Sequence, residues 1–78
     1  METISIRAQV DARGLNCPMP IVRTAQGIRP LAPGEYLELL ATDPGSVKDV
    51  AAWCRTTGNA LVEQRVADGV YRFVIRRT

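Results

Sequence analysis

Two prolines, Pro18 and Pro20, limit most strongly what the first third of this chain can form. Proline fits the first turn of a helix, where backbone amides have no acceptor within the helix, but it breaks a helix interior. Apolar residues then recur at helical spacing as far as Ile28, and another proline follows shortly afterwards. The sequence therefore predicts a helix from Pro18 to Arg29 that begins directly after Cys17.

Strands are predicted on either side of this helix. Apolar and polar residues alternate over residues 4–10 and again over 35–41, which is typical of half-buried strands. A loop over residues 11–16, with a bend at Gly14, leads into the helix. Two strands joined by one helix form a right-handed parallel crossover. Both strands are therefore expected to end at the same edge of the sheet.

The second half of the chain adds one helix and a hairpin. Asp43 followed by a proline predicts an N-cap and a first helical turn, and Gly58 is the expected C-terminal glycine. An Asp-Gly pair at 68–69 predicts a tight turn between strands over 61–66 and 70–76. Because each strand has one apolar face, we predict a two-layer α/β sandwich (α+β) with both helices on one face of the sheet.

The predicted topology brings several loops together around Cys17. The loop before the first helix, the loop 42–46 before the second and the hairpin turn at 68–69 are all expected at one edge of the sheet. Three short loops form a docking surface rather than a pocket.

The predicted helix start beside Cys17 has chemical consequences. Free amides and the positive end of the helix dipole favour a thiolate and lower the pKa of a thiol below its usual value of about 8.5. Asp11, Asp43 and Asp68, expected at the same edge, oppose this effect, so no strongly lowered pKa is predicted. The alternative is a small buried thiol in a strand-to-helix loop.

Composition narrows the possible functions. The 78 residues, expected to form one domain over 1–78, are 46% hydrophobic, and a net charge of +2 calls for no polyanionic partner. No apolar run approaches the ~20 residues of a membrane span and no signal-peptide pattern is present, so a cytoplasmic location is expected. Two cysteines and no histidine exclude the usual four-ligand zinc sites. We expect no metal or cofactor, and nothing calls for more than a monomer.

Several stretches of the chain resemble the TusA/SirA-like family of small sulfur-carrier proteins. They are DARGLNCPMP from Asp11, PGE from Pro33, TDPGSVKDV from Thr42 and DGVYRF from Asp68. The resemblance covers residues 10–77. It implies a mixed four-stranded sheet in the order 1-2-4-3, with two helices on one face.

The resemblance also implies a function, that of a sulfurtransferase in a sulfur relay. Members of the family carry sulfane sulfur as a persulfide on the motif cysteine, which is Cys17 here. They take it from a cysteine desulfurase or a rhodanese-type donor and pass it to an acceptor protein. Destinations include tRNA thiolation, molybdenum cofactor supply, sulfur oxidation and selenium metabolism, among which the sequence does not choose. Residues expected to shape the site or contact partners are Arg13, Asn16, Pro18, Met19, Pro20 and Asp43.

Four side chains have two possible roles each. Cys54 lies on the apolar stripe of the second helix, so we predict a core residue rather than a resolving partner for Cys17. Arg13 either helps to hold a sulfur anion or is solvated. Met19 either contacts partners or has no role. Asp43 is expected to cap the second helix and, in addition, to touch partners.

Two other kinds of function stay open. Arginines alternate with core residues in the predicted strands and would give the open sheet face a basic surface for RNA: Arg7, Arg65, Arg72 and Arg76. Such faces usually carry several exposed aromatic residues for stacking, and Tyr36 is the only candidate. No direct nucleic-acid partner is therefore expected. In a non-catalytic regulatory protein, Cys17 would be incidental.

Overall fold

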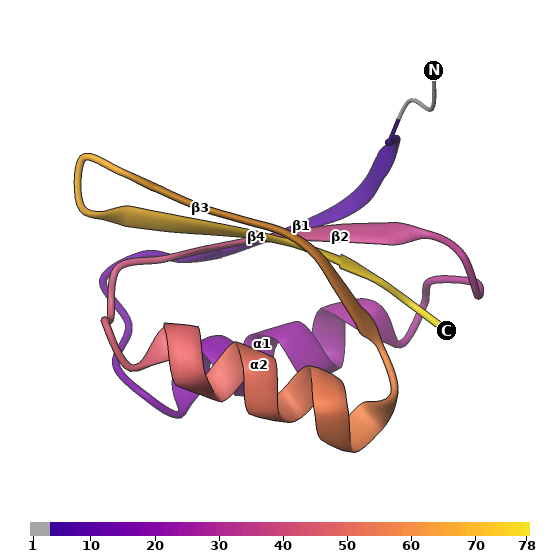
Figure 1. The fold of residues 1–78 in the computed structure, drawn as a ribbon, viewed down its shortest axis with the longest axis horizontal. Helices are drawn as coiled ribbons and strands as arrows, with labels where there is room; N and C mark the ends of the chain where they lie inside the picture. Colours follow the sequence, from indigo (N-terminus) through magenta and orange to yellow (C-terminus); the bar gives the residue numbers. More distant parts are fainter. Residues whose placement is uncertain (1–3) are drawn as a thin grey trace.

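Residues 4–78, which the computed structural model describes, form six elements in the predicted order. They are β1 (Ile6–Ala12), α1 (Met19–Ile28), β2 (Tyr36–Ala41), α2 (Ser46–Thr57), β3 (Ala60–Ala67) and β4 (Val70–Arg76). The strands form one mixed sheet in the order β1-β2-β4-β3, with β1 parallel to β2 and β4 antiparallel to both of its neighbours. Both helices lie on one face of this sheet and leave the other face open (Figure 1). The predicted two-layer fold and strand order are confirmed.

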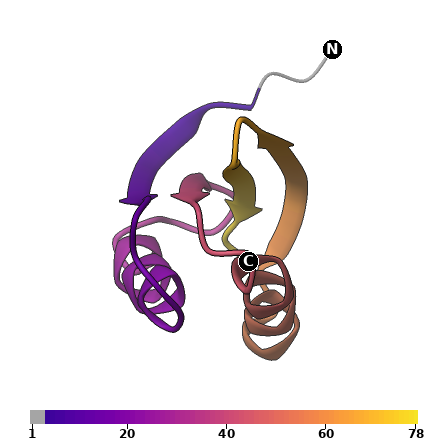
Figure 2. The ribbon, with the colours of Figure 1, turned by 90° about the vertical axis from the view of Figure 1, so that its left-hand side faces the viewer.

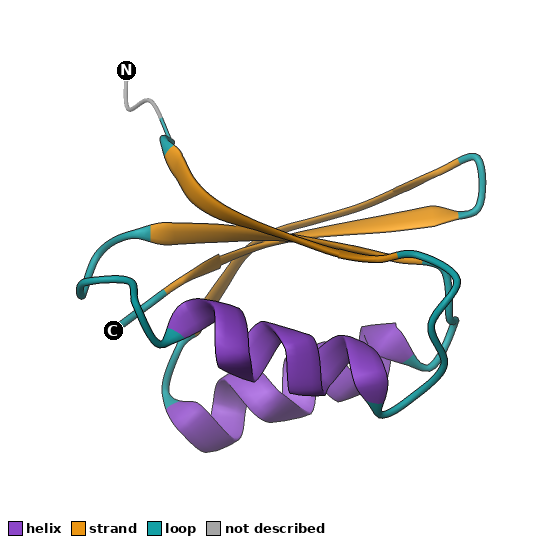
Figure 3. Ribbon diagram, turned by 180° about the vertical axis from the view of Figure 1, so that it is seen from behind, coloured by secondary structure: helices purple, strands orange, loops and turns teal. Residues whose placement is uncertain are grey.

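The two helices divide the covered face of the sheet between them. Viewed from one end, α1 lies beneath β1, and α2 lies beneath the β3–β4 half of the sheet (Figure 2). Loops close the two layers at both ends, as the view from behind shows (Figure 3). Within the described part of the chain, neither helix is long and apolar enough to cross a membrane.

The core fills the space between the helices and the sheet. Leu37 and Leu39 of β2 pair across the sheet with Ile75 and Phe73 of β4, and all four side chains are fully buried. Val50 of α2 belongs to the same cluster and is also fully buried. Burial of an apolar side chain of this size stabilises a fold by about 1.5–3 kcal/mol. This alternate-residue pattern is the one that the sequence predicted for β2.

Gly27 allows α1 to approach the sheet closely. A Cβ atom at this position would lie 2.8 Å from Val10 Cγ2 and 3.3 Å from Leu37 Cδ1. The sequence alone marks Gly27 only as a residue that weakens a helix. The structure shows the reason for it, because any side chain would push α1 away from β1 and β2.

Several element boundaries differ from the prediction by one or two residues, and the differences in β1 and α2 bear on the site. β1 continues through Asp11 and Ala12, because both residues extend the parallel pairing with β2. α2 begins at Ser46 rather than at Pro44, because Asp43 closes a turn before the helix. Its carbonyl accepts the Ser46 amide at 3.0 Å, and its Oδ1 accepts the Gly45 amide at 3.2 Å. Asp43 therefore orders the entry to α2 without being its N-cap residue.

The end of α1 is held by a residue far away in the sequence. The guanidinium of Arg77 donates through Nη1 to the carbonyls of Ile28 at 3.1 Å, Arg29 at 2.6 Å and Leu31. The last carbonyls of a helix have no partner within the helix, and a cation there also favours the helix dipole. The C-terminal end of the chain thus fixes α1 on the sheet.

Candidate functional site

The carboxyl ends of β1 and β2 and the β3–β4 turn lie at one edge of the sheet, on the left in Figure 1. The loop that carries Cys17 lies on the helix side of the sheet, beside the start of α2. The hairpin turn extends past the helices and away from this loop in both views (Figures 1 and 3). The surface around Cys17 is therefore formed by two loops and the first turn of α2, and not by the three loops that the sequence predicted. No pocket opens there or elsewhere among residues 4–78.

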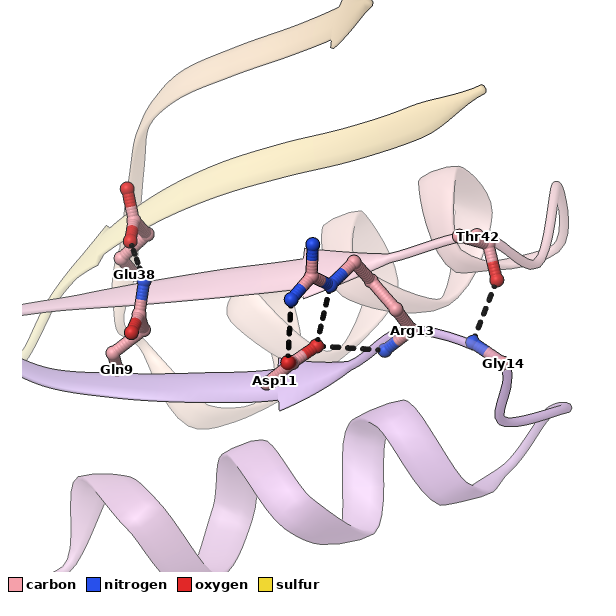
Figure 4. A network of polar contacts seen from close by, with 6 residues as sticks. All are labelled: Gln9, Asp11, Arg13, Gly14, Glu38 and Thr42. Carbon is pink, nitrogen blue, oxygen red and sulfur yellow. Dashed lines mark hydrogen bonds and ion pairs between the residues drawn. The ribbon is translucent and has the colours of Figure 1, made fainter. Parts of the chain in front are cut away.

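Two hydrogen bonds join the Cys17 loop to the loop before α2. The amide of Gly14 donates to Thr42 Oγ1 at 2.9 Å (Figure 4). The amide of Cys17 donates to Asp43 Oδ2 at 2.7 Å. Each bond comes from a backbone amide outside the regular elements, so the loop after β1 is positioned by side chains that follow β2. Asp43 thus lies at the site, as the sequence predicted.

The thiol of Cys17 is exposed and donates a hydrogen bond to Asp49 Oδ2 at 2.8 Å. Asp49 lies in the first turn of α2. The sequence analysis missed Asp49. Its position could nevertheless have been predicted from the sequence, because an acidic side chain in the first turn of the second helix must lie near the edge where that helix begins.

The expected free amides at the sulfur are absent from the start of α1, so this part of the prediction is wrong. Pro18 and Pro20 have no N–H, the Met19 amide donates to the Asn16 carbonyl at 2.9 Å, and the Ile21 amide donates to the Pro18 carbonyl at 3.1 Å. The prolines that start the helix also remove two of its first donors. Its remaining early amides are bonded to backbone carbonyls.

The carboxylates beside Cys17 raise the pKa of its thiol above the ordinary value. The largest cause is the hydrogen bond to Asp49, followed by partial desolvation and by the negative charges of Asp49 and Asp43. The expectation that the helix start would favour a thiolate is therefore wrong for this state of the protein. Asp43 opposes ionisation as predicted, but the dominant group is Asp49 rather than Asp11 or Asp68. The hydrogen bond and the neighbouring charges therefore favour the neutral thiol over the thiolate.

Comparison with known proteins decides the family. Residues 8–77 match the model of a family described as "Sulfurtransferase TusA". The chain belongs to this sulfurtransferase family. It is 43% identical over 70 residues to the sulfur carrier protein TusA of Allochromatium vinosum, covering 90% of this chain and 92% of that protein. It is 46% identical over 74 residues to a putative sulfur carrier protein of Halobacterium salinarum, covering 94% of this chain and 91% of that protein.

The fold agrees with this assignment. The crystal structure of a SirA-like protein from Desulfitobacterium hafniense superposes with a TM-score of 0.79 at 24% identity, covering 88% of this chain and 95% of that one. At this identity the superposition shows a shared fold. The resemblance to the TusA/SirA-like family that the motifs indicated is confirmed by the family match and the curated relatives.

The residues expected to shape the site differ in how far they reach the surface. Asn16, Pro18 and Met19 are exposed, and Met19 shows 39% of its area to solvent. Pro20 lies in the first turn of α1, and its side chain is fully buried. In this TusA-family chain, Pro20 can therefore shape the site but cannot contact a partner, whereas Met19 stays available for contact.

Arg13 is exposed to solvent, which is the second of the two roles considered for it, and it pairs with a carboxylate rather than with the sulfur. Its Nε and Nη2 each donate to the Asp11 carboxylate at 2.8 Å, and its amide donates to the same carboxylate at 3.2 Å (Figure 4). This pairing lowers the pKa of Asp11 to about 2. Arg13 is thus an exposed partner of Asp11, on the side of β1 away from α1, and it is not directed at the sulfur.

Cys54 lies in the core, as predicted. It is 5% exposed, belongs to the main apolar cluster, and is a free thiol like Cys17. Burial raises its pKa, which makes it a poor nucleophile. The sequence of this TusA-family chain thus contains two cysteines with opposite environments.

The open face of the sheet carries paired arginines. Arg72 of β4 donates to both Glu38 of β2 and Glu63 of β3. Arg7 pairs with Glu35 at 3.2 Å, and Arg65 lies 3.8 Å from Glu63. Carboxylates thus pair with three of the four arginines that the RNA-binding alternative named, whereas Arg76 is exposed and forms no ion pair among the described residues 4–78. The face therefore lacks the concentrated positive charge that this alternative requires.

Proposed function

We propose that this chain is a sulfur carrier that accepts sulfane sulfur as a persulfide on Cys17 and passes it to a partner protein. The observation that carries the proposal is the exposed thiol of Cys17 at the edge of the sheet, within the residues 8–77 that match a sulfurtransferase family. The other cysteine, Cys54, is buried in the core. Of the two thiols, Cys17 is the one that a partner protein can reach.

The shape of the surface suits this chemistry. Exchange at sulfur needs a thiolate and an open line of approach to the sulfur under attack. A flat surface allows the cysteine of a donor protein to come within bonding distance of Cys17, and later allows the cysteine of an acceptor to do the same. Direct handover of this kind would keep the sulfane sulfur away from free thiols in a reducing cytoplasm, where we place the reaction.

The proposed partners follow from the two half-reactions. A cysteine desulfurase or a rhodanese-type protein would present a persulfide to Cys17, and an acceptor protein would present its own thiolate to the outer sulfur. Met19 and Asn16 are exposed beside Cys17 and form part of the contact surface. Arg13 and Asp11 lie on the open side of the sheet and are assigned no role in the transfer.

Mass spectrometry of the intact protein tests the proposal. After incubation with a cysteine desulfurase and cysteine, the wild-type chain should gain the mass of one sulfur atom. The gain should vanish in Cys17→Ser and persist in Cys54→Ala. Because sulfinic acid adds nearly the same mass, the sample is measured again after dithiothreitol, which removes a persulfide but not a sulfinic acid.

Two results would overturn the assignment. One is a gain that persists in Cys17→Ser but is lost in Cys54→Ala. The other is a wild-type chain that gains no sulfur from desulfurase and rhodanese-type donors that load another family member in the same experiment. In that case the regulatory alternative, in which Cys17 is incidental, accounts for the site.

A further inference from the structure

The contact between Cys17 and Asp49 depends on a single hydrogen atom. The two side chains meet at 2.8 Å between Sγ and Oδ2. A carboxylate carries no hydrogen at neutral pH, so the thiol must be the donor. The contact therefore exists only while Cys17 is a protonated thiol.

Loading with sulfur removes that hydrogen. In the proposed reaction, Sγ of Cys17 bonds to the outer sulfur of the donor's persulfide and gives up its proton. The S–S bond of the donor breaks, and its electron pair stays on the donor's inner sulfur, which takes up a proton as a thiol. One S–S bond is exchanged for another, so no oxidant or reductant is consumed. The product has no hydrogen on Sγ and ends in an outer sulfur that ionises readily.

We propose that Asp49 is a positioning residue that distinguishes the empty carrier from the loaded one, holding the Cys17 thiol by a hydrogen bond from Sγ that an ionised persulfide cannot form. The inference rests on the proposed function of Cys17. In the empty carrier the thiol lies against α2 and stays protonated, so it reacts slowly with small electrophiles. In the loaded carrier the Asp49 carboxylate repels the sulfur chain, which turns away from α2 toward solvent and the acceptor protein.

Other charged groups near the sulfur do not replace Asp49 in this role. Asp43, from the loop before α2, is the second carboxylate that acts on Cys17, but it accepts the backbone amide and keeps that bond in both states. Asp11 is paired with Arg13. Asp68 lies in the hairpin turn, which extends away from the Cys17 loop, and its φ of 52° is one that asparagine adopts easily.

The first test is the pH dependence of alkylation of Cys17 by iodoacetamide, measured on the intact chain without any sulfur donor. In Asp49→Asn the midpoint of the rate profile should move to lower pH. At pH 7 the rate should rise about threefold for each unit by which the pKa falls, because a tenfold gain in thiolate is partly offset by its lower nucleophilicity. Asp68→Asn, which removes one carboxylate from the same edge, should leave the profile unchanged.

Asp49→Ala provides a second variant without the carboxylate, and circular dichroism selects whichever variant is folded. A profile in the folded variant that matches wild type would overturn the proposal. An equal shift in Asp68→Asn would also overturn it, because net charge at the edge would then explain the effect.

The second test follows the loaded state by NMR. Methyl methanethiosulfonate converts Cys17 to a methyl disulfide, which lacks the S–H as a persulfide does. In the wild-type chain this should shift the amide signals of residues 48 and 49, and in Asp49→Ala, which has no acceptor oxygen at this position, the shift should be much smaller. Equal shifts in both proteins would overturn the proposal. Since neither test uses a sulfur donor, failure of the persulfide experiment and failure of this inference can be told apart.

Discussion

The amide of Cys17 and the carboxylate of Asp43 form the hydrogen bond that fixes the reactive loop on the start of α2, with N and Oδ2 2.7 Å apart. The other oxygen of Asp43 accepts the Gly45 amide at 3.2 Å. One side chain therefore orders both the loop that carries the thiol and the turn that starts the neighbouring helix.

Two substitutions of Asp43 should distinguish the contribution of its charge to stability from that of its hydrogen bonds. Asp43→Ala leaves two backbone amides without their acceptor and should lower the free energy of unfolding by about 1–2 kcal/mol. Asp43→Asn keeps one acceptor oxygen and should lower it by about half as much. Urea denaturation of both variants measures the difference. Equal losses would show that the charge of Asp43, rather than its bond to Cys17, stabilises the loop.

Gly27→Ala should destabilise the fold although alanine is the better helix former. The new Cβ would lie 2.8 Å from Val10 Cγ2, and overpacking of this kind costs about 1–3 kcal/mol. The higher helix propensity of alanine returns up to about 1 kcal/mol. We expect a net loss of about 1 kcal/mol in urea denaturation.

A double-mutant cycle provides the control for Gly27. In Val10→Ala the interfering methyl group is gone, so adding Gly27→Ala to that background should be neutral or stabilising. If Gly27→Ala costs the same in both backgrounds, the contact with Val10 is not the reason for glycine at this position.

Gly27 and the strands that it packs against show how far the sequence predicts the fold. Prolines, glycines and alternating apolar residues are local signals, and from them the order of elements and the single apolar face of each strand were predicted. The need for glycine at 27 depends on how closely α1 approaches β1. That distance is set by packing between segments far apart in the chain, which no local pattern contains.

The candidate site shows the same difference between what local signals predict and what packing between distant segments decides. The motif located Cys17, and chain order placed Asp43 at the same edge. The electrostatics were predicted incorrectly because they depend on which atoms are already bonded. The Met19 amide donates to the Asn16 carbonyl, and the thiol itself donates to Asp49. A helix start therefore does not activate a cysteine when prolines remove some of its N–H groups and backbone carbonyls accept the others.

Arg77 should contribute to stability through the last turn of α1. All three of its side-chain bonds leave from one nitrogen, Nη1. Arg77→Met keeps the apolar stem but removes these bonds, and it should lower the free energy of unfolding by about 1–2 kcal/mol. In Arg77→Lys a single ammonium can replace the single nitrogen, so about half or more of that loss should be recovered.

Thermal unfolding and amide hydrogen exchange check this prediction for Arg77. Loss of protection in Arg77→Met should be concentrated in the last turn of α1. A uniform loss over the whole domain would contradict this, because the Arg77 side chain would then stabilise the whole fold rather than the end of α1. The backbone bonds of residue 77 to Gly34 and Glu35 are retained in both variants and would not explain such a loss.

The pair formed by Asp11 and Arg13 should be visible in an acid titration. The pKa of Asp11 is lowered to about 2 in the folded chain from its ordinary value of 3.8, chiefly by hydrogen bonds from Arg13. A group with a lowered pKa stabilises the fold above its ordinary pKa, and this contribution is lost as the pH falls from about 4 toward 2. Because both side chains are exposed, solvent screens the pair and the effect on stability should be small.

In Arg13→Gln the carboxyl signal of Asp11, followed by carbon-detected NMR, should titrate close to 3.8, while the alkylation profile of Cys17 stays as in wild type. A change in the Cys17 profile would show that Arg13 does act on the sulfur, contrary to the geometry of its bonds to Asp11.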